Sequence, residues 1–527
     1  MLEDDLLTLY RNERGRKYSL KKDSMLLVSL GNYDTLIENL GIQILMHNVN
    51  TKSKDMHAHR SFIHPEGLSS LETQKSANTY NIIGYSVPNV LEIPKFFKSL
   101  IQSNIPVLSK KRKKTHPIII AGGMGITNPE TFAPFVDLFV MGEGQDAIVN
   151  IANIYSESSN KTEFLKKAAQ IPGVYVPSFF NPIYSKNNFK GYNVKKEISQ
   201  TVKIQRFKDY SNSLISSTKI RKQTGSIMID KGCKMKCSYC QYSHVSGTYN
   251  PIPTTKIIEG LNNLQSLDVT QVYIISASTT NHPQMNQILN EVYKRNMIPI
   301  LGTTTIDKTL KNPRLLDIVH DGYNELSFPI DASSYRLRKQ IGKAKITDEK
   351  IIELAKLAID KGIKTFRIYN VLNLPSETRE DHEQFINLLN RIHSLDESMV
   401  MNIFCSPLFP QPKTTYENVI SESTENTMKK IDFIYTKTRD IARKLPNAEP
   451  VYSFESEFYS RGEDTSIRVL TFPKQVIALQ NILLRGDRKT GLAIYDLYTK
   501  GSLDYSHMLK LECANQSFEI FPWSHIE

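Results

Sequence analysis

Three of the five cysteines in this 527-residue chain lie within eight residues of one another. Cys233, Cys237 and Cys240 have the spacing Cys-x3-Cys-x2-Cys, and Tyr239 stands directly before the last of them. Thiolates are the ligands that iron–sulfur clusters take, and three of them on a short loop can hold three irons of a cubane cluster. The fourth iron then lacks a protein ligand. The spacing therefore predicts a redox cluster with one open coordination site.

Other uses of these cysteines are less consistent with the spacing. A structural zinc site needs four ligands, and although His244 follows Cys240 by four residues, Cys-x3-Cys-x2-Cys-x3-His matches no common zinc module. A redox-active Cys-x-x-Cys pair at 237 and 240 would leave Cys233 unexplained. A chance grouping of buried cysteines is the third alternative. The two other cysteines lie far apart, at Cys405 in an apolar segment typical of a buried thiol and at Cys513.

The segment that must position the cysteines is a series of strands alternating with helical stretches. The strand candidates are 225–229, 272–276, 298–301, 326–330, 364–369 and 400–405. This alternation favours a partial or full α/β barrel, in which ligands bind at the carboxyl ends of the strands. The cysteines come directly after the first strand, so we expect the cluster at that end of the barrel.

The first part of the chain has the pattern of a separate parallel sheet. The strand candidates are 25–30, 82–87, 118–121 and 138–141, and 35–48 carries a helical stripe. Glycine-rich turns follow the last two strands and provide the candidate ligand contacts: Gly122, Gly123, Gly125, Gly142, Glu143 and Gly144. Asn128-Pro129-Glu130 is expected to open a helix whose N-terminus favours an anionic group. The spacing is not GxGxxG, and a tight structural turn is an equal alternative.

Several further motifs carry a resemblance to a known family. The segments 328–338 with 342–343, 373–378 and 406–414 follow the fourth, fifth and sixth barrel strands, and 12–15, 128–130, 142–144 and 485–488 lie in the flanks. Together with the cysteine triad, these segments resemble the radical S-adenosylmethionine (SAM) superfamily, in a subgroup with an N-terminal cobalamin-binding-like domain. The resemblance covers nearly the whole chain. In one place the chain departs from the superfamily, because 276–279 lacks the glycines of a Gly-Gly-Glu-type segment.

The resemblance implies a cofactor set and the residues that hold it. A single 4Fe-4S cluster would be ligated by Cys233, Cys237 and Cys240, and SAM would chelate its open iron and be cleaved to a 5′-deoxyadenosyl radical. The expected SAM contacts are Tyr239, Ser276, Ser278, Asp331, Ser334, Arg338 and Asn373. Asp331 and Arg338 would meet the ribose and the carboxylate, the alternative being an exposed surface pair. No catalytic residue is identified.

The resemblance also implies a corrinoid, held without a histidine ligand. Corrinoid domains that use histidine carry Asp-x-His-x-x-Gly after the first strand, and here 31–34 contains no histidine. Asp55-Met56-His57 matches half of that motif, but Arg60 stands in place of the glycine. We therefore expect cobalamin, if bound, to be base-off and not His-on, lying against the glycine turns and 31–33 and 86–88.

The number and positions of the cysteines narrow the classes of enzyme that the chain can represent. No cysteine precedes Cys233, which excludes the second cluster of methylthiotransferases, and two distant cysteines after the triad exclude auxiliary clusters. A radical SAM enzyme remains, either a cobalamin-dependent methyltransferase or a catalyst of another radical modification of a small molecule, peptide or RNA. It would need an electron donor such as a flavodoxin or ferredoxin. The alternative is a non-catalytic iron–sulfur or RNA-binding protein that retains the barrel.

Composition sets the remaining bounds. The net charge is +12, and the basic run 110–114 is more typical of a solvated loop than of a nucleic-acid patch. No apolar stretch is long enough to span a membrane and the start of the chain is acidic, so we expect a cytoplasmic protein. The predicted fold is α/β, comprising a Rossmann-like cobalamin-binding-like domain (1–180), a connector (181–225), a partial (βα)6 radical SAM barrel (226–440) and a small α-rich C-terminal extension (441–527).

Overall fold

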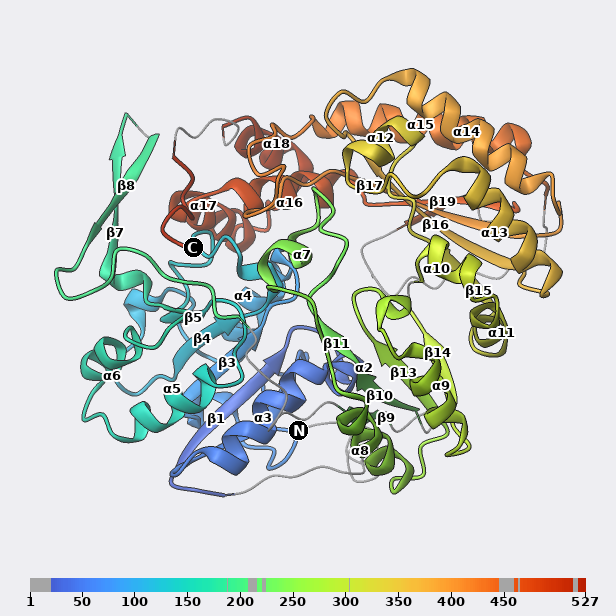
Figure 1. The fold of residues 1–527 in the computed structure, drawn as a ribbon. Coiled ribbons are helices and arrows are strands. Elements are labelled where there is room, and N and C mark those ends of the chain that lie inside the picture. The colour runs from blue at the N-terminus through green and yellow to red at the C-terminus, as the bar shows by residue number, and fades with distance from the viewer. Residues whose placement is uncertain are drawn as a thin grey trace.

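The computed structural model describes residues 20–527 except 187, 207–215, 220–223, 303, 445–458, 463–464 and 515–519. The motif at 12–15 lies outside these residues. Figure 1 shows an N-terminal α/β unit, in blue to teal, beside the barrel strands and helices, in green to orange. The C-terminal helices, in red, lie against the N-terminal unit. Among the described residues, no helix is both long and apolar enough to cross a membrane.

The N-terminal unit is built on a six-stranded sheet with the order β2-β1-β3-β4-β5-β6. The strands are β1 (Asp23–Ser29), β2 (Met56–Phe62), β3 (Ile82–Ser86), β4 (Ile118–Gly122), β5 (Leu138–Val140) and β6 (Val174–Tyr175). All are parallel except β6, which runs antiparallel to β5. This confirms the Rossmann-like prediction, and the four expected strands are present. Two strands, β2 and β6, were not expected.

Strand β2 was missed because its sequence, Met-His-Ala-His-Arg-Ser-Phe, is polar although every residue in it is buried. Its polar groups have partners that only the tertiary fold supplies. Arg60 pairs with Glu72, and His59 Nδ1 lies 2.8 Å from the hydroxyl of Tyr80. A buried polar side chain is tolerated when it is hydrogen-bonded, so burial here does not require an apolar sequence.

Five helices accompany this sheet: α2 (Tyr33–Glu38), α3 (Leu40–Lys52), α4 (Ile93–Gln102), α5 (Ala147–Ser156) and α6 (Lys161–Ala168). The stripe at 35–48, expected as one helix, is broken at Asn39, whose side chain accepts a hydrogen bond from the backbone N–H of Ile42 and caps α3. The expectation that Asn128 opens a helix is wrong. Its side-chain amide instead donates to the carbonyl oxygens of Leu483, Leu484 and Gly486.

The segment 181–225, expected to be an irregular connector, contains regular structure. Strands β7 (Phe180–Ser185) and β8 (Asn188–Val194) form an antiparallel hairpin. Strand β9 (Ser216–Lys219) then pairs antiparallel with the first barrel strand. Side-chain composition did not indicate these strands because they lie at edges, where polar residues are common.

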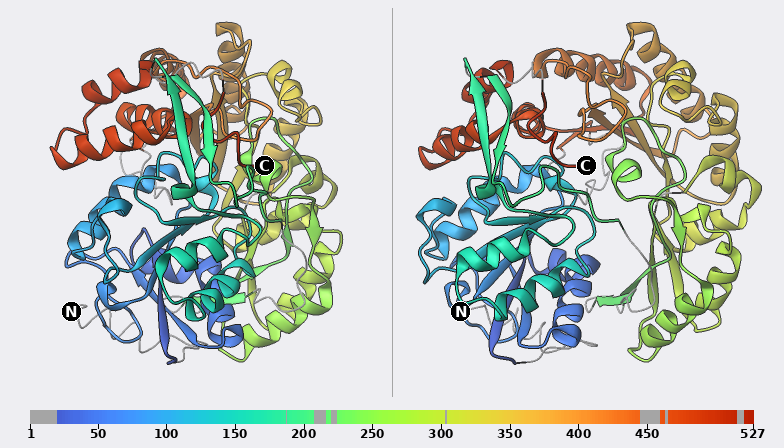
Figure 2. Two further views of the ribbon diagram at one scale, coloured as in Figure 1. Left: turned by 90° about the vertical axis from the view of Figure 1, so that its left-hand side faces the viewer. Right: turned by 60° about the vertical axis from the view of Figure 1, so that its left-hand side comes forward.

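The barrel consists of two sheets, with the orders β14-β13-β10-β9 and β15-β16-β17-β19-β18. The six expected strands are present as β10 (Thr224–Met228), β13 (Gln271–Ile275), β14 (Ile298–Leu301), β15 (Glu325–Phe328), β16 (Thr365–Leu372) and β17 (Val400–Pro407). They are parallel within each sheet, which confirms the partial (βα)6 barrel. Figure 2 shows these elements as an arc whose open side faces the N-terminal unit.

Helices cover the outside of the arc, and two further strands extend it. The helices are α8 (Thr254–Gln265), α9 (Met285–Tyr293), α10 (Ile306–Lys311), α11 (Arg314–Asp321), α12 (Tyr335–Gln340), α13 (Asp348–Asp360), α14 (Arg379–His393) and α15 (Thr424–Ile441). Strand β19 (Ile467–Thr471) is parallel to β17, and β18 (Tyr459–Arg461) closes the sheet in the antiparallel sense. Both strands lie in the C-terminal extension, which was expected to be α-rich.

The C-terminal helices join the hydrophobic core of the N-terminal unit rather than forming a core of their own. They are α16 (Lys474–Arg485), α17 (Arg488–Thr499) and α18 (Tyr505–Ala514). Ile477, Ile482 and Leu483 of α16 belong to the same buried cluster as the N-terminal strands. Arg488 pairs with the buried Glu130, which also accepts a bond from Tyr175. The two ends of the chain therefore fold as one unit beside the barrel.

Candidate cluster and cofactor site

The cysteine loop connects β11 (Asp230–Lys231) to α7 (Gln241–Val245), directly beyond the carboxyl end of β10. Its entry requires glycine, because Gly232 has φ +74° and a Cβ there would lie 2.8 Å from the carbonyl oxygen of Thr248. Strand β11 pairs with β12 (Asn250–Pro251), which ties the two ends of the loop together. The loop is thus held on both sides by backbone contacts.

All three cysteines of the loop are free thiols on one short turn. Cys237 is buried, whereas Cys233 and Cys240 are partly exposed. Burial raises the pKa of the Cys237 thiol to about 12, so a metal ion must displace its proton on binding. Three cysteines that are close in sequence, unpaired and only partly covered fit the ligand set of a cubane cluster.

The zinc alternative requires His244 as a fourth ligand beside the three cysteines. In the part of the chain that is described, no three His, Cys, Asp or Glu side chains, the three cysteines included, are grouped as they would be around a metal ion. His244 is engaged elsewhere, with Nδ1 2.9 Å from the carbonyl oxygen of Cys240 and Nε2 3.3 Å from the hydroxyl of Thr415. Cys405 is fully buried in β17, as expected, and the side chain of Cys513 lies outside the described residues.

The predicted SAM contacts Tyr239 and Asp331 meet beside the cysteine loop. The Tyr239 hydroxyl donates to Asp331 Oδ2 at 2.6 Å. Asp331 follows β15 with φ +55°, a left-handed conformation that is uncommon for a non-glycine residue. Lys343 forms an ion pair with Asp331 and donates to the carbonyl oxygen of Pro329 at 2.6 Å. These three side chains form one cluster of charges and hydrogen bonds, in which Lys343 lowers and Asp331 raises the pKa of the nearby Cys237 thiol.

Ser334 and Arg338 have structural partners close by. The Ser334 hydroxyl caps α12 by accepting from the backbone N–H of Leu337, and it donates to Asp381. Arg338 is fully buried and pairs with Asp348 rather than with Asp331. The alternative of an exposed Asp331–Arg338 surface pair is therefore wrong. Both residues are buried, and each has a different partner.

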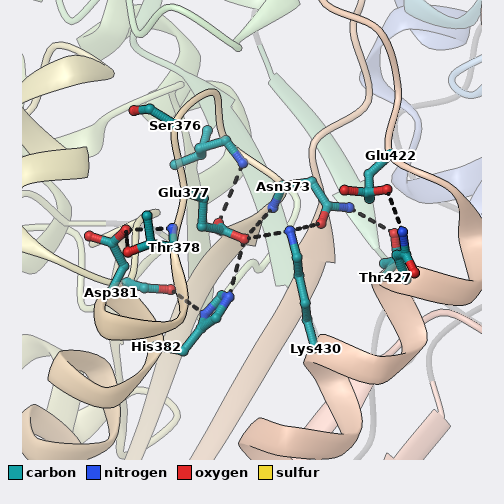
Figure 3. A network of polar contacts seen from close by, with 12 residues as sticks. Asn373, Ser376, Glu377, Thr378, Asp381, His382, Glu422, Thr427 and Lys430 are labelled. Atoms are coloured by element: carbon teal, nitrogen blue, oxygen red, sulfur yellow. Dashed lines mark hydrogen bonds and ion pairs between the residues drawn. The ribbon is translucent and has the colours of Figure 1, made fainter.

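The loop after β16, which contains Asn373, is held by a buried carboxylate (Figure 3). Glu377 accepts bonds from the backbone N–H groups of Asn373 and Leu374 and forms an ion pair with Lys430 at 3.0 Å, and His382 Nε2 lies 3.2 Å from the same carboxylate. Burial alone would raise the pKa of Glu377, but the contacts with His382 and Lys430 hold it below its ordinary value. Glu377 therefore stays ionised and holds the backbone of this loop in place.

The side chain of Asn373 points toward α15 within this network (Figure 3). Its Oδ1 accepts from Lys430 at 2.8 Å, and its Nδ2 donates to the hydroxyl of Thr427 at 2.8 Å. Asn373 also has φ +64°, and Ser376 in the same loop has φ +63°. Because the Asn373 side chain already has partners at both ends, its contact with SAM stays a prediction.

Sequence reasoning missed Asp230, around which the predicted residues Ser276 and Ser278 gather. The Ser276 hydroxyl donates to Asp230 Oδ2 at 2.9 Å, and the backbone N–H of Ser278 donates to the Ser276 hydroxyl. Tyr249 donates to the same carboxylate at 3.3 Å. The other oxygen of Asp230 is buried without a partner, and burial raises its pKa to about 6. The sequence offered one signal for Asp230, because a carboxylate stands at the end of the first barrel strand, three residues before Cys233.

A cavity lies along the carboxyl edge of the N-terminal sheet. It has a volume of about 840 Å³, part of it open to solvent, and its wall is mainly apolar. The lining residues are Leu27, Gly41, Ile42, Ile44, Leu45, Gly84, Tyr85, Ser86, Ile120, Ala121, Gly122, Gly123, Val140, Gly142, Glu143, Gly144, Gln145, Ile148 and Lys231. Lys231 comes from the barrel and pairs with Glu143 at 2.9 Å. The cavity therefore faces the strand that leads into the cysteine loop.

Five of the six predicted corrinoid contacts line this cavity, and Gly125 does not. Backbone packing accounts for several glycines. A Cβ at Gly123 would lie 2.5 Å from the carbonyl oxygen of Val87, and one at Gly142 would overlap that of Gln205; both residues have positive φ. A Cβ at Gly144 would meet only side chains, Leu45 Cδ2 at 3.4 Å and Val140 Cγ1 at 3.8 Å. The tight-turn alternative thus explains Gly123 and Gly142, whereas Gly144 is free of backbone constraint.

No histidine is among the residues that line the cavity. His57 lies in β2, at the edge of the sheet, and its Nδ1 accepts from the backbone N–H of Lys21 at 2.9 Å. The segments 31–33 and 87–88, expected against the corrinoid, are also absent from the wall. The cavity is therefore shifted from the predicted position toward β3, β4 and β5.

Comparison with known families agrees with this geometry. Residues 41–177 match the family model described as radical SAM proteins, N-terminal, and residues 227–389 match the radical SAM superfamily. The fold and the two matches define an α/β-barrel protein with an N-terminal companion domain. The chain belongs to the radical SAM superfamily of enzymes, and its N-terminal domain is of the kind that accompanies the barrel in that superfamily.

Relatives and solved structures are distant. An uncharacterized protein of Methanocaldococcus jannaschii is 25% identical over 341 residues, which is 62% of this chain and 67% of that one. The tRNA-2-methylthio-N(6)-dimethylallyladenosine synthase of Chromohalobacter salexigens is 22% identical over 218 residues, which is 39% of this chain and 47% of that protein. The radical SAM methyltransferase TsrM of Kitasatospora setae, solved with cobalamin and a [4Fe-4S] cluster, has a TM-score of 0.50 at 14% identity, covering 84% of this chain and 81% of its own. That likeness shows a shared fold.

Proposed function

We propose that this protein is a cobalamin-dependent radical SAM enzyme that transfers a methyl group to its substrate. The observation that carries the proposal is the cavity at the carboxyl edge of the N-terminal sheet, which is closed on one side by Lys231 from the cysteine-bearing strand. Ligands of open parallel sheets bind at this edge. The cavity and the cysteine loop therefore face one another across a single ion pair. A methyl carrier and a radical source would need such an arrangement.

Cys233, Cys237 and Cys240 would hold the cluster. Bound together, the cluster and SAM supply reductive cleavage of the C5′–S bond and so a 5′-deoxyadenosyl radical, with the electron coming from a donor such as a flavodoxin or ferredoxin. The chain orients the loop through Gly232 and the β11–β12 pair. Cys233 and Cys240 are partly exposed, so one side of the loop is accessible.

Two carboxylates near the loop would orient SAM. Asp230 has an unpaired buried oxygen that suits the amino group of the methionine part, since a buried acceptor without a partner is stabilised by an ammonium donor. Ser276 holds this carboxylate from the next strand. Asp331, fixed by Tyr239 and Lys343, would contact the ribose hydroxyls on the opposite side. This assignment explains why the chain dispenses with a glycine-rich segment at 276–279.

The residues of the first cavity fit a corrinoid bound through its faces and edges. The wall is apolar, and the small residues Gly84, Gly122 and Gly144 leave room for a flat macrocycle. Glu143 and Lys231 are the charged residues in the lining and can bond to amide side chains of the ring. No histidine is among the lining residues, so the chain would bind cobalamin without a histidine on cobalt.

Anaerobic reconstitution tests the proposal. The full chain would be treated with iron, sulfide and hydroxocobalamin, and absorbance would follow both cofactors. We expect about four irons per chain and a bound corrinoid, with formation of 5′-deoxyadenosine or S-adenosylhomocysteine on addition of SAM and a strong reductant. Zinc in place of iron would contradict the cluster assignment. A loaded cluster that never turns over SAM would favour a non-catalytic protein.

A further inference from the structure

The turn after helix α12 packs directly against the cysteine loop. The backbone carbonyl oxygen of Ile341 accepts a hydrogen bond from the backbone N–H of Ser238 at 3.2 Å. A Cβ at Gly342 would lie 4.0 Å from the Cα of Cys237 and 3.9 Å from the carbonyl oxygen of Lys236. Gly342 is exposed, whereas Cys237 is buried. The exposed turn thus lies next to the backbone of the buried cysteine.

Three exposed lysines stand around this contact and are called the lysine patch. Lys236 directly precedes Cys237, Lys339 lies in the last turn of α12, and Lys345 follows the turn at Gly342. Within the part of the chain that is described, none of the three pairs with a carboxylate. The patch therefore presents positive charge to solvent beside a predicted cluster ligand.

The side chain of Tyr335 links two members of the lysine patch. Lys339 Nζ lies 5.0 Å from the centre of the Tyr335 ring. The hydroxyl of the same ring donates to the carbonyl oxygen of Ala344 at 3.2 Å, and Ala344 directly precedes Lys345. The two lysines therefore occupy neighbouring positions on one surface, and the contact between the turn and the cysteine loop adds Lys236 to it.

The other charges of the segment 334–350 are balanced close by. Three of its cations form ion pairs, which are Arg336 with Asp381, Arg338 with Asp348, and Lys343 with Asp331. The remaining acidic residue of the segment, Glu349, stands next to the cation Lys350. No carboxylate of this segment is thus left over to offset the lysine patch.

A positive surface beside a redox site favours a negatively charged donor, because complementary charge raises the rate of encounter. We infer that the lysine patch is the docking surface of an acidic one-electron donor protein, such as a flavodoxin. This inference rests on the proposed function, in which SAM cleavage consumes one electron. Each transfer takes one electron from an anionic flavin hydroquinone, which becomes a neutral semiquinone, and delivers it to the oxidised cluster without movement of a proton.

RNA is the competing occupant of a basic surface. Proteins that bind single strands combine positive charge with aromatic faces on which bases stack. The ring in this patch, Tyr335, already has the ammonium group of Lys339 over it. The place of the patch, against the backbone of Cys237, also serves electron delivery rather than recognition of a base.

The first measurement is the binding of an acidic flavodoxin, in its oxidised form, to the full reconstituted chain by calorimetric titration at low ionic strength. The variant Lys339→Glu/Lys345→Glu reverses two charges of the patch, and Lys236 is left unchanged because it lies between two ligand cysteines. Lys111→Glu/Lys114→Glu is the matched control, since it makes the same charge change at exposed lysines of the N-terminal unit. Iron content and the thermal midpoint show that each variant is loaded and folded.

The second measurement is the rate of electron transfer between the cluster and flavodoxin. It is run without SAM, from the reduced cluster to oxidised flavodoxin, because both directions of transfer use the same encounter complex. The absorbance of the flavin semiquinone reports the rate. Benzyl viologen replaces flavodoxin in a parallel series, as a small cationic acceptor that needs no docking surface.

We expect Lys339→Glu/Lys345→Glu to weaken binding and slow transfer to flavodoxin by about 10-fold or more, because electrostatic steering contributes about 10- to 1000-fold. The difference should nearly vanish at about 1 M salt, where the screening length is about 3 Å. The control variant should behave as the wild type does, and transfer to benzyl viologen should not slow in either variant.

An equal loss in both double variants would overturn the inference, because net charge alone would then explain it. Unchanged flavodoxin binding in Lys339→Glu/Lys345→Glu, or a short RNA that binds these lysines more tightly than flavodoxin does, would overturn it as well. If the charge-reversal variant fails to fold, Lys339→Gln/Lys345→Gln and the salt dependence of the wild type carry the test. Flavodoxin binding is measured without SAM, so a failure of SAM cleavage or of methyl transfer is recognised separately.

Discussion

The barrel and the N-terminal sheet present the carboxyl ends of their parallel strands in different ways. The barrel edge carries polar side chains that are buried and held in place, such as Asp230, Asp331 and Glu377, and it uses left-handed backbone at Asp331 and Asn373. The edge of the N-terminal sheet carries glycines and apolar side chains, with Glu143 as its own charged residue in the larger cavity. Under the proposed function, the barrel would hold a small charged cofactor through side chains, and the N-terminal unit would hold a flat ligand through backbone and shape.

The largest effect should come from the cysteine loop. Replacing Cys237 by Ala removes the buried ligand, and we expect iron below one equivalent per chain and more than a 100-fold loss of SAM cleavage, because two thiolates do not retain a cubane. Iron analysis and chromatography of 5′-deoxyadenosine measure both. Cys405→Ala is the matched control, since this thiol is buried in β17 away from the loop. Equal iron in both variants would contradict the ligand assignment.

Corrinoid binding at the carboxyl edge of the N-terminal sheet should depend on the shape of the cavity. Gly144→Val places a side chain where a Cβ makes ordinary contacts with the side chains of Leu45, at 3.4 Å, and Val140, at 3.8 Å, so the fold should persist while the cavity is filled. We expect at least 10-fold weaker binding of hydroxocobalamin with unchanged iron content, read by absorbance titration. Gly123 is unsuitable for this test, because a side chain there would clash with the backbone at Val87. Unaltered corrinoid binding in Gly144→Val would place the ligand elsewhere.

At the carboxyl edge of the barrel, stability and SAM binding should instead depend on charge. The pKa of Asp230 is raised to about 6 by burial, so its ionisation costs stability as the pH rises from about 4 through 6. Asp230→Asn should therefore raise stability by on the order of 2 kcal/mol at pH 7.5 and by much less at pH 4, as urea unfolding would show. The same variant should weaken SAM binding.

Asp381 serves as a control, because its substitution by asparagine should change stability in the opposite direction. Burial opposes its ionisation, but bonds from Ser334 and the backbone N–H of Thr378 hold its pKa below the ordinary value. Asp381→Asn should therefore destabilise the protein at pH 7.5, and the difference should shrink as the pH falls through the range in which free aspartate titrates. If both aspartate variants changed stability in the same direction at pH 7.5, the electrostatic reading of the barrel edge would be wrong.

The smallest effect is expected at His57. This histidine lies in the edge strand β2 and does not line the cavity, so His57→Ala should leave the spectrum of bound cobalamin unchanged. Electron paramagnetic resonance of the cobalt(II) form gives the more sensitive comparison. A nitrogen splitting that disappears in the variant would show that the corrinoid binds beside β2.

Local pattern was enough to predict much of the barrel. The six strands are apolar runs separated by helical periodicity, and the cysteine spacing is a short-range signal, so both could be read from neighbouring residues. Tyr239 and Asp331 were singled out by resemblance, and the structure brings them to within hydrogen-bond distance across 92 residues. Their pairing with Lys343 depends on the left-handed turn at Asp331, which composition does not reveal.

The unpredicted features depend on contacts between distant segments. Strand β2 is polar in sequence and buried only because Glu72 and Tyr80 supply partners. Asn128 and Glu130 were assigned to a ligand-facing helix, but they bind the C-terminal helices through Gly486 and Arg488. Such residues resemble functional motifs because a buried polar contact between units constrains a sequence as strongly as a ligand does.

The central claim is that one composite site lies between the cysteine loop and the glycine-lined cavity, bridged by Lys231 and Glu143. Crystals of the chain reconstituted with iron, sulfide and hydroxocobalamin would test it most directly, with anomalous diffraction recorded at the iron and cobalt absorption edges. We predict iron at Cys233, Cys237 and Cys240 and cobalt inside the cavity, with no histidine nitrogen bound to cobalt. Cobalt located elsewhere, or bound to a histidine, would contradict the account.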